Sequence, residues 1–277
     1  MSSRIRLCVL SFLSFVLSLA LHSQTPVPAA ASKSGATVPD KMLQTIKTQV
    51  SLDQGLNNPS GPRLRFVKLD DFNRDGLHYV RYRVYAEAAP VNTPLIVALW
   101  RIGTYIENIQ ILSHEAYVTS KGLLLLNKPK PGQEDAETVA DGTELDVALH
   151  VAEGEPDRFV VRTKDSKVLI PGTLIPYPIE STGKTCKLRA LLATPNAEAV
   201  LIYVDGRVPH SELPFQSSSE GELHDGKFIA NAQGEGVTLV SPYVTGKDSG
   251  MLKFSVKSDD CTAAVEIPWG KTSYHPK

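Results

Sequence analysis

The chain has 277 residues, of which 42% are hydrophobic and 21% are charged, and this balance indicates a folded protein and excludes a largely disordered one. The formal net charge is −1, and no cluster of Lys and Arg stands out along the chain. The composition therefore excludes strong electrostatic attraction to nucleic acid or to anionic lipid, and we expect no nucleic-acid partner.

Residues 1–23 have the three parts of a secretory signal peptide. Arg4 and Arg6 precede an uncharged apolar run over residues 7–19, and small residues follow around Ala20. The run is shorter than the roughly 20 residues that a membrane-spanning helix needs, although an uncleaved anchor is the alternative. We expect an exported protein, periplasmic or extracellular, with no transmembrane span after signal cleavage.

Removal of the signal peptide leaves two cysteines, Cys186 and Cys261. In an oxidising compartment such a pair predicts a disulfide, and two buried free thiols are the alternative. Closing a loop of about 75 residues would stabilise the fold by roughly 4 to 5 kcal/mol in the chain-entropy model.

Residues 250–270 carry the clearest secondary-structure pattern in the chain, because apolar and polar residues alternate on both sides of a turn at residues 258–260. This alternation predicts a β-hairpin with one buried face. The residues expected on that face are Leu252, Phe254 and Val256, then Cys261, Ala263, Val265, Ile267 and Trp269.

The rest of the chain predicts an all-β protein with two β-sandwich domains in tandem. Short strands without helices between them are typical of sandwiches. We expect strands at residues 78–86, 95–102, 105–112, 122–126, 145–151 and 158–162, and again at 186–192, 200–204, 223–230 and 237–244. The proposed organisation is a flexible linker (24–39), a short helix to about residue 50 with its lead-in (40–60), a first sandwich (61–170), a Pro-rich interdomain segment (171–183), a second sandwich (184–270) and a C-terminal tail (271–277).

This organisation resembles tandem immunoglobulin-like modules in secreted bacterial proteins. A disulfide between the first and last strands of the second domain would be similar to the staple of many such sandwiches. A tryptophan midway between the cysteines is missing, since Trp269 lies beyond the second one. The resemblance is architectural, so it implies a fold and no active site.

Asp71, Asn73, Asp75 and Gly76 form the sharpest local motif. Oxygen-bearing side chains at alternate positions, followed by glycine, resemble the start of a calcium loop, with the first three residues as ligands. The match fails at the position of the bidentate carboxylate, where Tyr82 stands. A weak calcium site and a polar turn between two strands are both open, and calcium is the one cofactor that the sequence suggests.

Tyr79, Arg81, Arg83 and Tyr85 alternate with apolar residues and should share the outward face of one strand. Rigid rings beside guanidinium groups suit the recognition of a sugar, a peptide or an acidic partner. Cross-strand pairing or packing between domains would use the same residues. The segment 127–142 is long for a loop inside a domain, and its composition favours mobility over function.

No motif of an enzyme family is present: there is no H-E-x-x-H, C-x-x-C or G-x-S-x-G. We therefore expect a non-catalytic exported binding or structural module whose partner is a protein or glycan of the cell envelope. The alternatives are a carbohydrate- or peptide-binding accessory protein and a secreted hydrolase without a recognisable motif.

Overall fold

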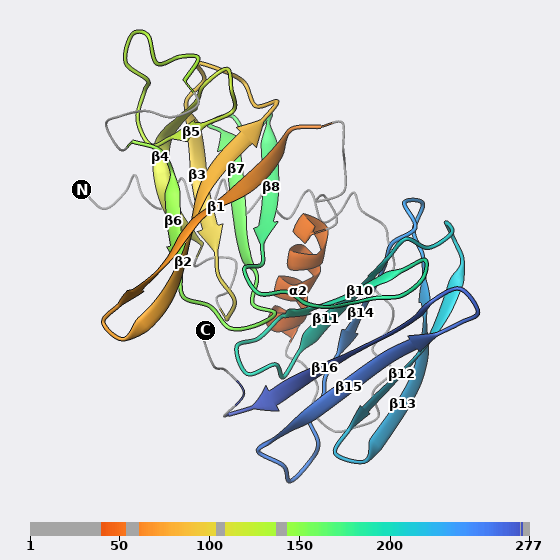
Figure 1. The fold of residues 1–277 in the computed structure, drawn as a ribbon. Helices are drawn as coiled ribbons and strands as arrows, with labels where there is room; N and C mark the ends of the chain where they lie inside the picture. The colour runs from red at the N-terminus through yellow and green to blue at the C-terminus, as the bar shows by residue number, and fades with distance from the viewer. Residues whose placement is uncertain (1–39, 54–60, 104–108, 137–142, 272, 274–277) are drawn as a thin grey trace. The chain divides into compact units, whose positions relative to one another are not determined.

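The computed structural model describes residues 40–53, 61–103, 109–136, 143–271 and 273, and their fold is shown in Figure 1. In this part of the chain one helix and sixteen strands are present, and the strands pair antiparallel. The all-β prediction is confirmed. The expected signal peptide and linker, residues 1–39, lie outside the described residues, and no described helix has the length and apolar character to cross a bilayer.

The described residues belong to two compact units. Unit 1 takes residues 40–150 and 157–174, and unit 2 takes residues 151–156 and those from 175 onward. The predicted domain limits at 170 and 184 stay a prediction.

Unit 1 contains a three-stranded sheet in the order β1-β2-β6 and a five-stranded sheet in the order β5-β4-β3-β7-β8. The rings of Phe66 on β1 and Phe159 on β7 lie 5.2 Å apart, which joins the two sheets in one core. Helix α2 packs beside β8 and buries Leu52 against Trp100. The element bounds are α2 Asp40–Asp53, β1 Arg63–Arg74, β2 Leu77–Glu87, β3 Leu95–Trp100, β4 Gln110–Val118, β5 Leu124–Leu125, β6 Asp146–Leu149, β7 Asp157–Thr163 and β8 Leu169–Leu174.

Unit 2 contains two four-stranded sheets, in the orders β14-β11-β10-β9 and β13-β12-β15-β16. The predicted hairpin at residues 250–270 is confirmed as β15 and β16, in which Phe254 pairs with Val265 and both are buried. The bounds are β9 Ile179–Thr182, β10 Lys187–Leu192, β11 Val200–Asp205, β12 Glu212–Ser219, β13 Glu222–Ile229, β14 Gly236–Val240, β15 Ser249–Lys257 and β16 Thr262–Gly270.

The segment 171–183 corrects one expectation, because its prolines do not prevent regular sheet. Pro171 lies in β8 opposite Val160, and β9 forms further along the same segment. Both are terminal strands of their sheets, where a missing backbone N–H can face away from the ladder without cost. Proline content alone was therefore a poor guide, and the sequence analysis did not predict these two strands.

Strand β12 was not predicted, because its inward-facing positions are partly polar. Leu213 and Phe215 occupy two of them, but Ser217 and Ser219 occupy the other two and are buried as well. The buried Ser219 hydroxyl donates to the carbonyl of Pro242 at 2.6 Å and accepts from Trp269 Nε1 at 2.9 Å. Hydrogen bonds thus replace the apolar alternation that marks a strand in the sequence.

Candidate functional site

The outer face of the β1-β2-β6 sheet carries the predicted binding residues, and we call it the ladder face. Tyr79, Arg81, Arg83 and Tyr85 occupy alternate positions of β2, whereas the residues between them point to the core, as the full burial of Val84 shows. The four side chains lie on one face of β2, where Tyr85 packs against the buried Leu123 and Leu125, and a binding role for them stays a prediction. Partners on β1 and β6 complete the face.

Arg81 forms the most exposed pair of the ladder face. Its Nε and Nη2 atoms donate to the two carboxylate oxygens of Asp70 at 3.0 and 2.5 Å, and both side chains remain more than two-fifths exposed. This bidentate hydrogen bond raises the pKa of the Arg81 guanidinium. The planar fork geometry fixes the guanidinium while its outer edge stays in water.

Arg83 is held by two carboxylates at a half-buried position. Its Nε and Nη2 atoms donate to Asp146 at 2.9 and 3.0 Å, and its Nη1 atom lies 3.3 Å from Glu144 Oε1. The hydrogen bond with Asp146 raises the pKa of Arg83 against the effect of burial. This arginine therefore ties β2 to β6.

At the other end of β2, Glu87 accepts hydrogen bonds from Arg63 Nε at 2.6 Å and Arg65 Nε at 2.5 Å. These bonds lower the pKa of Glu87. The Arg65 guanidinium also lies 4.1 Å from the ring centroid of Tyr85, a cation–π contact. Each charged group of this part of the face thus has a partner on the neighbouring strand.

A row of three rings crosses the sheet near the β1–β2 turn. Phe72 and Tyr79 stack with centroids 5.4 Å apart and planes 11° apart, and His150 lies 5.5 Å from Tyr79 on its β6 side. Because β2 lies between β1 and β6, neighbours cover both faces of the Tyr79 ring. Tyr79 therefore offers its edge and hydroxyl to a ligand, and not the open ring face on which a sugar would stack.

The proposed calcium ligands lie at the tip of the β1–β2 hairpin. Asp71 and Asn73 belong to β1, and Asp75 and Gly76 form a two-residue turn with φ values of 54° and 77°. Both positive φ values are typical of a type I′ turn, which explains the Asp-Gly pair. The loop geometry of an EF-hand is therefore absent from this hairpin, and the motif serves the turn.

The ligand atoms of this motif contact other side chains. Asp71 lies 2.7 Å from Lys68 Nζ, and Asn73 Oδ1 lies 3.2 Å from His78 Nδ1. Calcium binding stays a prediction, and unfolding temperatures measured in excess calcium and in chelator test it. Over the described ranges, no group of three or more His, Cys, Asp or Glu side chains is placed to hold a metal ion.

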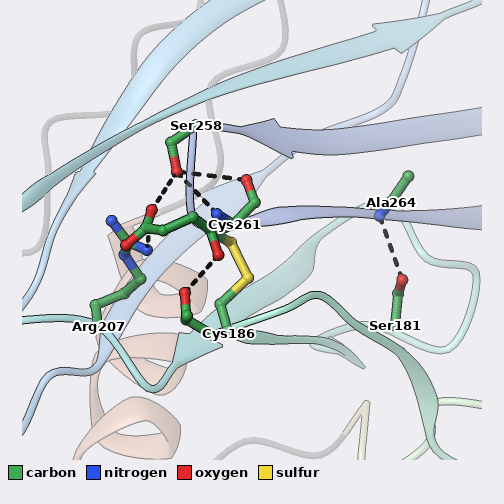
Figure 2. Close-up of a disulfide and its surroundings, with 8 residues drawn as sticks. Ser181, Cys186, Arg207, Ser258, Cys261 and Ala264 are labelled. Atoms are coloured by element: carbon green, nitrogen blue, oxygen red, sulfur yellow. Dashed lines mark hydrogen bonds and ion pairs between the residues drawn. A yellow bond between two sulfur atoms is a disulfide. The ribbon is translucent and has the colours of Figure 1, made fainter.

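Unit 2 is closed by the predicted disulfide between Cys186 and Cys261, with Cα atoms 5.6 Å apart and both residues buried. The bond links the turns that precede β10 and β16, as Figure 2 shows. Cys186 was expected inside the first strand of this domain, but β9 precedes it and the cysteine lies in the following turn. A Cβ at Gly183 would lie 2.9 Å from Cys186 Sγ and 2.7 Å from the carbonyl oxygen of Thr262, so this close approach requires glycine.

The turn before Cys261 is fixed by a small polar network (Figure 2). Ser258 Oγ donates to Asp260 Oδ1 at 2.8 Å, and Arg207 Nη1 donates to the same oxygen at 2.9 Å. The Ser258 bond first and the Arg207 bond second lower the pKa of Asp260. Thr185 Oγ1 donates to the backbone carbonyl of Asp260 at 2.5 Å, which joins the two turns that the disulfide links. The arrangement supports the bond.

A buried ion pair in unit 1 was not predicted. Arg158 on β7 donates from Nε and Nη2 to the two carboxylate oxygens of Asp53 at 2.9 and 2.7 Å, and Thr173 Oγ1 donates to Asp53 at 2.6 Å. Both charged side chains are 1% exposed. The pair fixes the last residue of α2 on β7 and β8. Nothing in the local sequence marks Arg158 as buried.

The described part of the long segment at 127–142 ends at residue 136 and is tied to the end of β4. Ser120 N donates to the carbonyl of Glu134 at 2.8 Å, and Thr119 Oγ1 donates to the carbonyl of Ala136 at 2.9 Å. Residues 137–142 lie outside the described residues, so the mobility expected for this segment stays a prediction.

Sequence reasoning found the β2 half of the ladder face and missed its partners. Asp70 and Phe72 lie beyond a register shift between Lys68 and Asp70, and a bulge of this kind leaves no reliable signal in one sequence. Asp146 lies on β6, far along the chain, and His150 follows directly after that strand. Comparison with known proteins adds no function, because no family model and no curated protein matches the chain.

Proposed function

We propose that this protein is an exported, non-catalytic β-sandwich module that binds a protein or peptide partner through the ladder face. The observation that carries the proposal is that this face is both accessible and held in place. Arg63, Arg65 and Arg81 are 43 to 52% exposed in their side chains, yet each is fixed by a carboxylate on the neighbouring strand. Side chains that are already ordered lose little entropy when a partner binds.

The chemistry of the face favours a polar protein surface over a glycan. Arginine and tyrosine are the residue types that most often dominate the energy of protein interfaces. Positive and negative groups lie side by side on this face, as in the Arg81–Asp70 and Arg65–Glu87 pairs, so a partner with complementary charges would fix its register along β2. The covered faces of Tyr79 argue against sugar stacking, which makes the carbohydrate alternative the less favoured one.

Export is supported by the Cys186–Cys261 bond, because disulfides persist in oxidising compartments. Fractionation of the producing cells, with N-terminal sequencing of the mature chain, tests this part of the proposal. We expect the exported fraction to hold a chain that begins near residue 24. A cytoplasmic chain with free thiols at both cysteines would contradict it.

Binding is tested with matched variants of two exposed ion pairs. The immobilised protein is exposed to a glycan array and to solubilised envelope proteins, and bound material is quantified. We expect a protein partner whose retention falls at least about 10-fold in Arg81→Ala, a loss of roughly 1.4 kcal/mol. Lys253→Ala is the control, because Lys253 forms a similar exposed pair with Glu266 at 3.2 Å in unit 2. If the Arg81→Ala and Lys253→Ala variants retain equal amounts of the partner, the ladder face is not the binding surface.

A further inference from the structure

Strand β13 is an edge strand that has neither a bulge nor a proline to block pairing. It is the terminal strand of the β13-β12-β15-β16 sheet, and Figure 1 shows it at the border of that sheet. Its eight residues pair with β12 without a register shift, and they include no proline. Leu223 and Ile229 are 58% and 65% exposed. A regular edge with exposed apolar side chains is a template for another strand.

The edge strand β1 shows the contrast. It carries a bulge between Lys68 and Asp70, and charged side chains occupy most of its exposed positions. Bulges and edge charges are the devices by which proteins block edge-to-edge pairing. The bulge and the many charges guard β1, whereas β13 presents a continuous ladder and has only two charged residues, Asp225 and Lys227, of opposite sign, among its exposed positions.

The backbone groups that β13 offers can be identified. Glu220 and Gly221 have φ values of 48° and 92° and form a two-residue hairpin turn, and Ala230 N donates to the carbonyl of Ser211 just beyond the strands. Hydrogen-bonded pairs alternate along an antiparallel ladder, so the even-numbered residues of β13 bond to β12. Residues 223, 225, 227 and 229 therefore direct their N–H and C=O groups to the free edge.

The side chains at those four positions form a pattern that is complementary to itself. In chain order they are Leu223, Asp225, Lys227 and Ile229, and all four are exposed. An antiparallel copy of the strand centred on Gly226 would place Leu223 opposite Ile229 and Asp225 opposite Lys227. Each contact would occur twice, which is the property of an isologous twofold interface.

Hydrogen-bond geometry and charge together select this register. In an antiparallel pair of β13 strands, the residues that direct their backbone groups to the free edge must lie opposite the same kind of residue in the other copy. The registers to compare therefore have their twofold axis at Asp225, at Gly226 or at Lys227. A centre at Asp225 opposes two aspartates, and a centre at Lys227 opposes two lysines. Only the centre at Gly226 pairs opposite charges, and like charges directly across a ladder are destabilising.

We propose that two copies of this chain associate through antiparallel pairing of their β13 strands about Gly226, which joins two four-stranded sheets into one of eight. About eight new backbone hydrogen bonds would form, two at each of the four outward-facing pairs. The interface is one strand wide and buries little area, so the dimer is weak and depends on concentration. The partner that fits this edge is a second copy of β13, because the outward-facing residues of the strand are complementary to the same residues read in the opposite direction.

Charge reversal provides the test, with the whole chain analysed by sedimentation over a range of concentrations. We expect Asp225→Lys and Lys227→Asp each to weaken dimerisation by about 30-fold, because two symmetric sites change from opposite to like charge. The combined variant Asp225→Lys/Lys227→Asp restores complementarity and should return to within about 3-fold of the original Kd. The partners that these residues have within the chain, Glu212 and Gln216, are exposed, so the fold should tolerate the changes.

Two further variants separate edge pairing from a general charge effect. Leu223→Pro removes an outward-facing N–H without touching the β12 ladder, and it should abolish the dimer while circular dichroism stays unchanged. Lys253→Glu reverses a charge on the outer face of β15, away from the edge, and should leave the Kd unaltered. A monomer at every concentration up to about 1 mM would overturn the proposal. A dimer that ignores both single reversals would overturn it as well, and so would association with some other protein but not with itself.

Discussion

Removal of the disulfide should destabilise unit 2 by an amount that the structure allows us to calculate. Cys186 and Cys261 are 75 residues apart in the sequence. In the chain-entropy model a closed loop of that length removes about 15 cal/mol/K from the unfolded chain, which is about 4.5 kcal/mol at 25 °C. The variant Cys186→Ala/Cys261→Ala loses this constraint together with a small amount of buried contact. We expect its free energy of unfolding to fall by about 4 to 5 kcal/mol.

The two tryptophans allow the loss to be assigned to one unit. Trp100 lies in the core of unit 1 and Trp269 in that of unit 2, and both are 1% exposed. In a Trp100→Phe background, fluorescence during denaturant unfolding reports unit 2 alone. We expect the Trp269 transition to shift strongly to lower denaturant on removal of the disulfide, with a larger m-value because the unbridged chain expands further on unfolding.

A matched measurement follows unit 1 in the Trp269→Phe background. The Trp100 transition should keep its midpoint when the cysteines are replaced. A loss below about 1 kcal/mol at Trp269 would refute the reasoning, because it would mean that the bond constrains little of the unfolded chain. An equal shift at both tryptophans would refute the assignment of the bond to unit 2.

Four other substitutions have expected outcomes that thermal or denaturant unfolding can measure. Asp53→Ala leaves the buried guanidinium on β7 without its carboxylate and should cost about 3 to 5 kcal/mol, whereas Thr173→Val removes one hydrogen bond and should cost about 1 kcal/mol. Equal losses of stability in the two variants would contradict the conclusion that the Asp53 carboxylate contributes more than the Thr173 hydrogen bond. Ser219→Ala leaves the Trp269 N–H and the Pro242 carbonyl without their shared partner, and we expect a loss of about 1 to 3 kcal/mol; a neutral result would contradict the role given to this hydroxyl. Because the folded-state pKa of Asp260 lies below its ordinary value of 3.8, its stabilising effect is present above that pH and is lost as the pH falls through the folded pKa. Asp260→Asn should therefore flatten the pH dependence of stability below about pH 4, and an unchanged acid limb would contradict this assignment.

The parts of the fold that the sequence predicted are those where burial follows a period of two. The β15–β16 hairpin alternates without interruption between core and water, and its strands were predicted to within a residue or two at each end. The β2 strand was found for the same reason, since Val80 and Val84 alternate with the residues of the ladder face. Where the burial in the folded protein follows the local pattern of apolar and polar residues, a single sequence is sufficient to predict a strand.

The parts that were missed have buried polar groups or unusual strand positions. Ser217 and Ser219 on β12 are buried, and the Ser219 hydroxyl finds hydrogen bonds there, so the strand has no continuous apolar stripe. Pro171 lies in a terminal strand, where its missing N–H is harmless. In both strands the deciding feature is the pairing with distant parts of the chain, which is invisible in the local sequence.

The candidate site follows the same division. Alternation along β2 identified the four side chains of the ladder face, but their partners depend on strand pairing and on the bulge in β1. Arg158 illustrates the limit most clearly, because its burial depends on Asp53, 105 residues earlier in the chain. The distance along the sequence, and not the chemistry of the residues, hid these contacts.

The central proposal is that this chain matures in an oxidising compartment as a disulfide-closed β-sandwich protein. The most direct test is alkylation of the protein under denaturing, non-reducing conditions at the moment of cell lysis, followed by mass spectrometry of the peptides that contain Cys186 and Cys261. The account predicts that neither cysteine is alkylated and that the two peptides are recovered as one linked species. Full alkylation of both cysteines in the mature protein would contradict it.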